Sequence, residues 1–388
     1  MENLLIKRKA RVFKSKNILK AIYLLFFYGL VVACNSNQSV NTTSDSDSLA
    51  SMEISDTMGI KPTGPKPDWA PGIMPESQAV MEKLMSYKDT PIPQLTAQEA
   101  RKNHTPTDAV MDLMNENNIS VPPSMVDTMG KNIPVTGGNI HVRMYTPKSG
   151  TVPFPMIVYY HGGGFVIADL DVYDASARAL SEQAGAVVVS VAYRLAPEFK
   201  FPTAHMDSYA AYEWAVKNAA SLKANPKMVA VAGESAGGNL AINTAIMARD
   251  KGFTLPVHIL SVYPIAQADM NTPSYQKNAN AKPLDKPMMA WFTKNYLNNA
   301  AEAKDTKISL VNANLKGLPP TTIITAEIDP LQSDGMMLTD KLKAAGVTVN
   351  SKNYDGVTHE FFGMAAVVPQ AKEAQAFAAQ HLKSAFNK

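Results

Sequence analysis

The chain has 388 residues, of which 46% are hydrophobic and 18% charged, and this globular composition excludes collagen-like and wholly disordered proteins. Its single cysteine excludes an intramolecular disulfide and any zinc or iron–sulfur site built on several cysteines, and we predict no metal site. The net charge of +3 arises in residues 1–33, which hold seven Lys and Arg against one acid, whereas the rest of the chain is slightly acidic. That balance predicts no nucleic-acid partner.

The N-terminus has the pattern of a secretory signal peptide. A basic stretch precedes an uncharged apolar run over 21–33, which is too short to cross a hydrocarbon core of roughly 30 Å as a helix. Cys34 follows directly, and VVAC at 31–34 resembles the lipobox of bacterial lipoproteins, whose cysteine becomes acylated after cleavage. We therefore predict a signal peptide over 1–33, lipidation of Cys34 and a lipoprotein of the bacterial cell envelope. The alternatives are a secreted protein without an anchor and, less favoured, an anchor helix that is not cleaved.

Residues 34–74 are expected to form a disordered tether and linker behind the lipidated cysteine. Residues 35–48 hold almost no apolar side chains that could offset the entropy cost of folding. Residues 58–75 are rich in proline and glycine and also have the composition of a linker.

The next segment, 75–124, is expected to be an N-terminal helical cap. Apolar side chains recur at helical spacing over 76–87 and again over 107–118, where Thr107 is the expected N-cap. Strand-like alternation is missing from this part of the sequence.

Residues 125–388 alternate between predicted strands and helices. Segment 140–145 alternates like a half-buried strand, while the remaining strands are continuous apolar runs, as in parallel strands covered on both faces. These runs are 155–160, 186–192, 228–232, 257–263, 321–325 and 347–349, with helices expected at 174–184, 203–220, 239–251, 331–345 and 370–386. The pattern predicts an α/β domain with a mostly parallel, twisted sheet flanked by helices. Residues 265–316, rich in Asn and Met, fit a second cap insertion.

Two glycine-rich motifs directly follow predicted strands. GESAG at 233–237 matches G-x-S-x-G between a strand and a helix, the context in which a tight turn exposes the serine hydroxyl. HGGG at 161–164 leaves backbone N–H groups unshielded and able to point at a developing oxyanion. Each motif alone has another interpretation, a glycine-rich helix start for the first and a flexible or phosphate-binding loop for the second. Nucleotide binding is disfavoured because neither a Walker lysine nor a G-x-G-x-x-G helix start accompanies the motifs.

The two motifs occur in register with three more, YRLAPE at 193–198, DPL at 329–331 and HEF at 359–361. Together they resemble the signatures of the hormone-sensitive-lipase-like carboxylesterases, the bacterial type IV esterases of the α/β-hydrolase superfamily. The resemblance covers about residues 75–388. It implies the α/β-hydrolase fold with a helical cap, and a serine hydrolase that needs no metal or organic cofactor.

The resemblance also implies roles for individual residues. Ser235 would be the nucleophile, His359 the general base and then the general acid, and Asp329 the group that holds the imidazole in the right tautomer. The oxyanion hole would be formed by the N–H groups of Gly163, Gly164 and Ala236. His161 and Gly162 would support this loop from behind, and Glu234 would support the turn at the nucleophile.

The positions of these residues agree with those roles. Asp329 lies just past a predicted strand end, where a loop acid is needed, and its rivals are Glu327, Asp334 and Asp355. His359 follows the strand expected to end near residue 354. Four other histidines, in the cap, within strands or at a helix start, are expected to be packed or surface residues; they are His104, His141, His205 and His258.

The chain departs from the family at two places. Glu234 precedes the nucleophile where many members carry Asp or Thr. QSD at 332–334 follows the DPL motif where Arg-Asp often stands, so the polar contact that braces the acid loop is expected to be either missing or made differently.

The predicted function is hydrolysis of short- to medium-chain acyl esters through an acyl-enzyme, in an adaptable apolar pocket beneath a Met-rich cap. Several alternatives stay open: a deacetylase of polysaccharides or xenobiotic esters, an amidase or peptidase with the same triad, or a non-catalytic ligand-binding protein. The last resembles plant gibberellin receptors, which lack the triad histidine. Expected partners are a small ester, a membrane through the lipid anchor, and a second copy in a homodimer.

Overall fold

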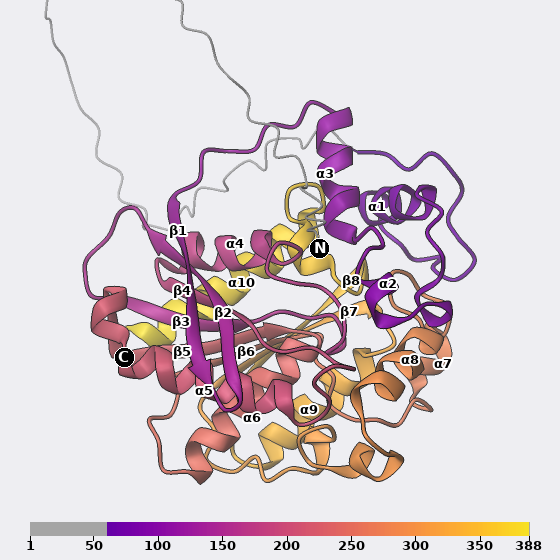
Figure 1. Ribbon diagram of the computed structural model, residues 1–388. Coiled ribbons are helices and arrows are strands. Elements are labelled where there is room, and N and C mark those ends of the chain that lie inside the picture. The colour runs from indigo at the N-terminus through magenta and orange to yellow at the C-terminus, as the bar shows by residue number, and fades with distance from the viewer. Residues whose placement is uncertain (1–59, 388) are drawn as a thin grey trace, which may run out of the picture. The chain divides into compact units, whose positions relative to one another are not determined.

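An eight-stranded sheet lies at the centre of the computed structural model, which describes residues 60–387 (Figure 1). The predicted signal peptide over 1–33 and the predicted lipidation site Cys34 lie outside these residues. The strand order is β1-β2-β4-β3-β5-β6-β7-β8, with antiparallel pairing of β2 to β1 and β4 and parallel pairing elsewhere. The strands are β1 (Val126–Val135), β2 (Gly138–Pro147), β3 (Phe154–Tyr160), β4 (Val187–Ala192), β5 (Ala224–Glu234), β6 (Ile259–Val262), β7 (Thr321–Ile328) and β8 (Val349–Thr358). The predicted α/β-hydrolase fold is confirmed.

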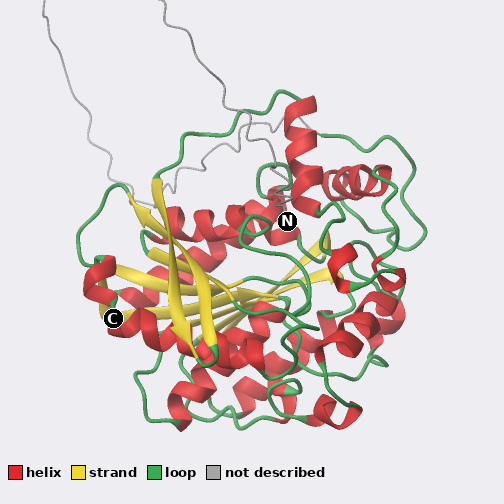
Figure 2. Cartoon of the chain, viewed as in Figure 1, coloured by secondary structure: helices red, strands yellow, loops and turns green. Residues whose placement is uncertain are grey.

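The central strands are covered by helices on both faces (Figure 2). Along β3, Val158 points into one apolar core, while Ile157 and Tyr159 point into the other. The first core includes side chains of α5 (Thr203–Lys217), α6 (Ala236–Asp250) and α9 (Gln332–Ala344), and the second those of α4 (Asp174–Ala184) and α10 (Pro369–Phe386). Burial on both faces explains why these strands are unbroken apolar runs in the sequence.

The two edge strands differ from the sequence expectation. The pattern does not predict β1, because six successive residues of this strand are exposed and carry no apolar alternation. Strand β8 continues to Thr358, past the apolar run 347–349 and past the expected end near residue 354, because its backbone pairs along the length of β7. Backbone pairing, which does not depend on apolar side chains, therefore extends the sheet at both edges.

Two helical segments supplement the sheet domain. Residues 75–124 hold α1 (Pro75–Ser86), α2 (Ala97–Ala100) and α3 (Pro106–Glu116), and residues 265–316 hold α7 (Pro273–Lys277) and α8 (Lys286–Tyr296). The indole Nε1–H of Trp291 in α8 donates a 3.0 Å hydrogen bond to the carbonyl of Leu95, which joins the two segments. Short 3₁₀ helices complete the chain: η1 (Ile92–Gln94), η2 (Ala219–Leu222), η3 (Ala300–Lys304), η4 (Leu310–Asn312) and η5 (Phe361–Met364).

The start of α3 corrects one expectation. Its N-cap is Thr105 and not Thr107, because Thr105 and Asp108 form a reciprocal capping box and Pro106 occupies the first helical position. Thr107 lies inside the first turn, where its hydroxyl donates to the carbonyl of Val172 at 2.7 Å.

The end of the predicted tether is also corrected, because residues 60–74 pack on the domain. Ile60, Ala70 and Ile73 are buried in the core, and the N–H of Met74 donates to the carbonyl of Gly356 at 2.8 Å. The proline- and glycine-rich composition suggests a linker, but three apolar side chains are enough to anchor the segment. Among the described residues, no helix has the length and apolar character needed to cross a bilayer.

Candidate active site

Ser235 sits at the sharp turn between β5 and α6, with backbone angles φ 57° and ψ −117°. The turn is so tight that a Cβ atom on Gly237 would lie 1.9 Å from the carbonyl oxygen of Tyr160. The N–H of Ser235 donates to the carbonyl of Val262 on the neighbouring strand at 2.8 Å, which fixes the strained residue. The sequence motif thus forms the strand–turn–helix structure that it predicts.

Ser235, His359 and Asp329 form one chain of hydrogen bonds. The Ser235 Oγ lies 3.0 Å from Nε2 of His359, and Nδ1 of His359 lies 2.7 Å from Oδ2 of Asp329. Because a carboxylate only accepts, Nδ1 carries the proton and Nε2 accepts from the serine hydroxyl. The other oxygen of Asp329 accepts from the N–H of Leu331 at 2.8 Å. Parallel strands bring the three residues to one edge of the sheet, since each follows the end of its strand, β5, β7 or β8.

The electrostatics of His359 suit a base. Burial is the largest single effect and lowers the pKa of the imidazole, but the carboxyl groups of Asp329, Glu360 and Glu234 together raise it, and the net direction is upward from the ordinary value of 6.5. The imidazole therefore gains a proton more readily than a histidine in water.

The HGGG loop runs beside the Ser235 hydroxyl. Gly163 has φ 96°, and a Cβ atom there would lie 2.2 Å from the carbonyl oxygen of Ile167, so only glycine fits. Within residues 60–387, the N–H groups of Gly163 and Gly164 donate to no protein acceptor. Ala236 is the first residue of α6, where an N–H has no intrahelical partner. All three predicted oxyanion donors thus lie at the site.

His161 supports the loop and does not face the cavity. Its Nδ1 lies 2.8 Å from the carbonyl oxygen of Gly162, and its ring stacks on Tyr193 with centroids 4.3 Å apart. Burial lowers the pKa of His161 to about 4, so the ring is neutral at physiological pH. The Tyr193 hydroxyl donates to the carbonyl of His161 at 2.9 Å.

Glu234 is buried behind the nucleophile, where two tyrosines hold it. The hydroxyl of Tyr159 donates to its Oε1 at 2.5 Å, and that of Tyr263 donates to its Oε2. Burial raises the pKa of Glu234 to about 7. The ring of Tyr263 lies 4.5 Å from that of His359, so the Glu234 carboxyl supports the imidazole through this tyrosine. Sequence reasoning missed both tyrosines, because they lie in or next to apolar strands and match no motif.

The acid loop is braced from α7, which fulfils the expectation of a different contact after the DPL motif. The hydroxyl of Ser274 donates to the carbonyl of Pro330 at 2.5 Å and accepts from the N–H of Ser333 at 3.0 Å. The side-chain amide of Asn278 donates to the carbonyl of Asp329 at 3.0 Å. Sequence alone carries no signal for Ser274 or Asn278, which lie about 50 residues upstream.

The rival acids have other partners. Asp334 accepts from the N–H groups of Ala266 and Gln267 at 2.9 and 3.1 Å, and burial raises its pKa to about 7. Glu327 accepts from the N–H of Gly356 at 2.9 Å. The remaining rival, Asp355, accepts from the side chain of Asn353. Of the four candidate acids, Asp329 is the one that the structure brings to His359.

Four other histidines lie apart from this chain of hydrogen bonds. His205 is buried between Tyr296 and Asn239, and burial lowers its pKa to about 4. His104 stacks on Tyr87 at 3.9 Å and lines the outer part of the cavity described next. His141 bonds to Asn132 on the neighbouring strand, and His258 bonds to Thr322.

A cavity of about 590 Å³ opens over the reacting groups. Ser235, His359 and the HGGG loop form part of its wall, and the cap helices contribute apolar side chains, among them Met288, Met289 and Phe292 of α8. The Met-rich surface expected for the cap therefore lines the cavity, where unbranched side chains can adapt to different ligands.

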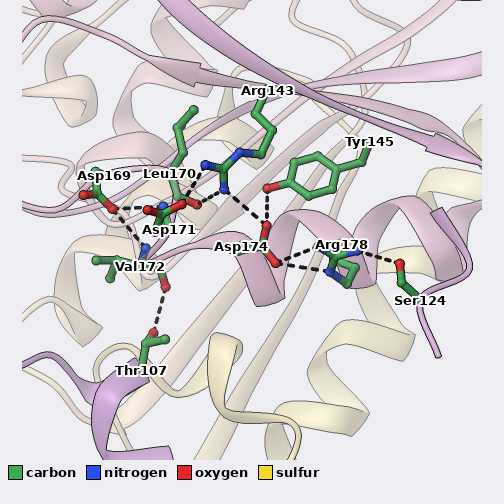
Figure 3. A network of polar contacts seen from close by, with 10 residues as sticks. All are labelled: Thr107, Ser124, Arg143, Tyr145, Asp169, Leu170, Asp171, Val172, Asp174 and Arg178. Atoms are coloured by element: carbon green, nitrogen blue, oxygen red, sulfur yellow. Dashed lines mark hydrogen bonds and ion pairs between the residues drawn. The ribbon is translucent and has the colours of Figure 1, made fainter. Parts of the chain in front are cut away.

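Another part of the wall, residues 168–173, is held by the polar network drawn in Figure 3. Arg143 of β2 donates to Asp171 at 2.6 Å, and Thr107 of α3 donates to the carbonyl of Val172 at 2.7 Å. The network thereby ties this wall to both the sheet and the cap. Its other members are Ser124, Tyr145, Asp169, Leu170, Asp174 and Arg178.

Comparison with known proteins points to one family of hydrolases. A family described as having the alpha/beta hydrolase fold matches residues 157–363. The chain is 42% identical over 253 residues to carboxylesterase NlhH of Mycobacterium tuberculosis, covering 64% of this chain and 79% of the relative. It is 33% identical over 241 residues to ethyl acetate hydrolase of Pseudomonas putida, covering 61% and 76%.

Solved structures give the same result. A thermostable esterase from Pseudomonas putida is similar with a TM-score of 0.75 and 32% identity, over 82% of this chain and 98% of that one. A hyperthermophilic esterase from the archaeon Pyrobaculum calidifontis gives a TM-score of 0.69 and 36% identity, over 75% and 94%. The chain therefore belongs to the α/β-hydrolase superfamily and, within it, to the hormone-sensitive-lipase-like carboxylesterases.

Proposed function

We propose that the protein is a serine carboxylesterase that hydrolyses short- to medium-chain acyl esters through an acyl-enzyme on Ser235. This proposal depends on the chain of hydrogen bonds from Ser235 through His359 to Asp329. Ser235, at one end of this chain, lines the cavity. The activities of similar proteins, a carboxylesterase and an esterase of Mycobacterium tuberculosis, agree with it.

The first half of the reaction forms the acyl-enzyme. The Ser235 Oγ attacks the ester carbonyl carbon while Nε2 of His359 takes the hydroxyl proton. The Asp329 carboxylate stabilises the imidazolium that results and keeps Nδ1 protonated. The N–H groups of Gly163, Gly164 and Ala236 would bind the tetrahedral oxyanion, and such preorganised donors supply much of the rate enhancement in acyl transfer.

The second half regenerates the enzyme. As the tetrahedral intermediate collapses, the imidazolium gives its proton to the departing alcohol. A water molecule then attacks the acyl carbon while His359 takes its proton. The bond from this carbon to the Ser235 Oγ breaks as the imidazolium returns the proton to Oγ, and the carboxylic acid leaves.

The cavity supports the choice of substrate size. Its volume of about 590 Å³ lies within the range of roughly 300–1,000 Å³ that small-molecule sites occupy. Apolar cap residues beside Ser235, such as Ile265 and Phe292, suit an aliphatic acyl chain.

A fluorophosphonate probe tests the proposal without a guess about the ester. Residues 35–388 are treated with the probe, and the labelled peptide is mapped by mass spectrometry. We expect a label on Ser235 that is lost when the protein is denatured by heat first. A series of p-nitrophenyl esters of rising chain length, with a matched p-nitroanilide, then compares esterase with amidase activity. Folded protein that resists the probe and hydrolyses none of the esters would disprove the proposal and favour a ligand-binding role.

For the location of the protein we propose a lipoprotein of the bacterial cell envelope, anchored by acylated Cys34. The support is the basic and apolar pattern of residues 1–33 and the placement of the single cysteine directly after it. A homodimer is part of the same proposal by likeness to the family, and the molecular mass in solution tests it.

A further inference from the structure

The wall of the cavity carries a carboxyl group that the acyl-enzyme reaction does not by itself require. Glu360 follows His359 directly, and its Oε1 lies 3.9 Å from Nε2 of His359, the nitrogen that faces Ser235. Its side chain is 20% exposed and lines the cavity. Since Asp329 faces Nδ1, the imidazole has a carboxyl group near each of its two nitrogens.

The backbone conformation and the burial of Glu360 both lower the stability of the folded state. Its backbone has φ 69°, in the left-handed region that disfavours residues with a Cβ atom, and glycine would adopt it without strain. Burial also disfavours the charged carboxylate and raises the pKa of Glu360. Strained residues of this kind cluster at functional sites.

The carboxyl group is held toward the imidazole by a specific contact. The hydroxyl of Tyr173, at the start of α4, donates to Oε1 of Glu360 at 2.6 Å. The same hydroxyl packs against the HGGG loop, because a Cβ atom on Gly162 would lie 2.1 Å from it. Tyr173 thereby links Glu360 to the loop that carries the proposed oxyanion donors.

We propose that Glu360 is a positioning residue that acts through His359, by stabilising the imidazolium that forms when Ser235 attacks. This inference rests on the proposed esterase function. At 3.9 Å the carboxyl group is too far away to compete with Ser235 for a hydrogen bond to Nε2, yet close enough for a charge–charge attraction between two largely buried side chains. The attraction grows as the proton arrives on the imidazole, so it favours the transition state over the resting state.

The groups around His359 and Glu360 indicate that the imidazolium is the cation with which Glu360 interacts. Within residues 60–387, neither Lys nor Arg forms an ion pair with Glu360 or with Glu234. Asp329 faces Nδ1, and Glu234 lies behind Tyr263, whose ring contacts the imidazole. The hydroxyls of Tyr159, Tyr173 and Tyr193 also lie nearby, and burial raises the pKa of each, which keeps them neutral.

Two variants of the full protein test the inference through the pH profile of kcat/KM on a p-nitrophenyl ester. Glu360→Gln keeps an acceptor for Tyr173 but removes the charge, and Glu360→Gly removes the side chain and the backbone strain. The acid limb of the profile is the range of pH in which His359 becomes protonated and kcat/KM falls. In both variants we expect this limb to lie about one pH unit lower than in the wild type. The same loss of imidazolium stabilisation should lower kcat about tenfold with little change in KM. The glycine variant should also melt at a higher temperature than the wild type.

The matched control is Glu373→Gln, which makes the same charge change at an exposed residue of α10 and should leave the acid limb in place. If the wild type hydrolyses the ester and both folded Glu360 variants show the acid limb at the same pH as the wild type, the inference is overturned while the esterase function stands. A lower melting temperature with an unmoved limb would assign Glu360 a purely structural role and overturn it too. A wild type that hydrolyses no ester would refute the proposed function itself.

Discussion

At the scale of single residues, Asp329 illustrates how a buried carboxylate can orient a base. It is fully buried, one oxygen meets Nδ1 of His359 and the other accepts from the N–H of Leu331. Asp329→Asn keeps the shape of the side chain but turns an acceptor into a possible donor, so it favours the wrong imidazole tautomer. We expect kcat to fall by a factor on the order of 10⁴ while the protein stays folded, as kinetics and circular dichroism together would reveal.

The control for this change is Asp355→Asn, because Asp355 bonds to Asn353 on the exposed edge of β8. We expect its kcat to stay within a factor of two or so of the wild type. Full activity in the Asp329 variant, or its loss in the Asp355 variant, would show that the acid was assigned wrongly.

Glu234 leads to a prediction about stability and pH. Burial raises its pKa from 4.5 to about 7, so the folded state holds a proton that the unfolded state loses at lower pH. The contribution of this group is therefore fully present below about pH 4.5 and is lost as pH rises through about 7. We expect Glu234→Gln to reduce the decline in stability between pH 5 and pH 8 by about 1–3 kcal/mol. Chemical denaturation at both pH values measures this, and an identical decline in variant and wild type would contradict it.

At the scale of elements, the short helix α7 supports the acid loop from outside the sheet domain. The Ser274 hydroxyl makes two hydrogen bonds to that loop, to Pro330 and Ser333, and the side chain is buried. Ser274→Ala leaves the carbonyl of Pro330 and the N–H of Ser333 without this partner, so we expect a loss of about 1–3 kcal/mol in unfolding free energy. A misplaced Asp329 should also lower kcat about tenfold with little change in KM.

The comparison variant at this scale is Ser221→Ala, which removes a hydroxyl that bonds to Asn218 at an exposed turn. It should leave both stability and kcat close to those of the wild type. Unchanged kcat in the Ser274 variant would mean that α7 contributes to stability alone.

At the scale of the whole molecule, the proposed anchor determines where the esterase works. Cys34→Ala removes the sulfur that would carry the lipid, so we expect the protein to move from the membrane fraction to the soluble fraction, with ester hydrolysis per molecule unchanged. Fractionation of cells that express the full chain, followed by immunoblotting, measures this. A processed Cys34→Ala protein that still sediments with membranes would place the anchor elsewhere.

Much of the fold and the chemistry could be predicted from the sequence, because local physics dictates them. The tight turn at Ser235 needs glycine two positions away on either side, and that requirement is visible as G-x-S-x-G. The central strands are apolar runs because helices cover both faces of the sheet, and the helices between them follow the same apolar spacing. By contrast, β1 carries no such signal, because its exposed side chains face water on the edge of the sheet.

Tertiary structure alone decided which distant groups meet. Four carboxyl groups were candidates for the acid, and the register of β7 against β8 brings Asp329 to His359 while the other three bond elsewhere. The positions of Ser274 beside the acid loop and of Tyr263 between Glu234 and His359 follow from the same packing. Contacts across such sequence separations depend on how strands and helices pack together, and short-range patterns do not encode that packing.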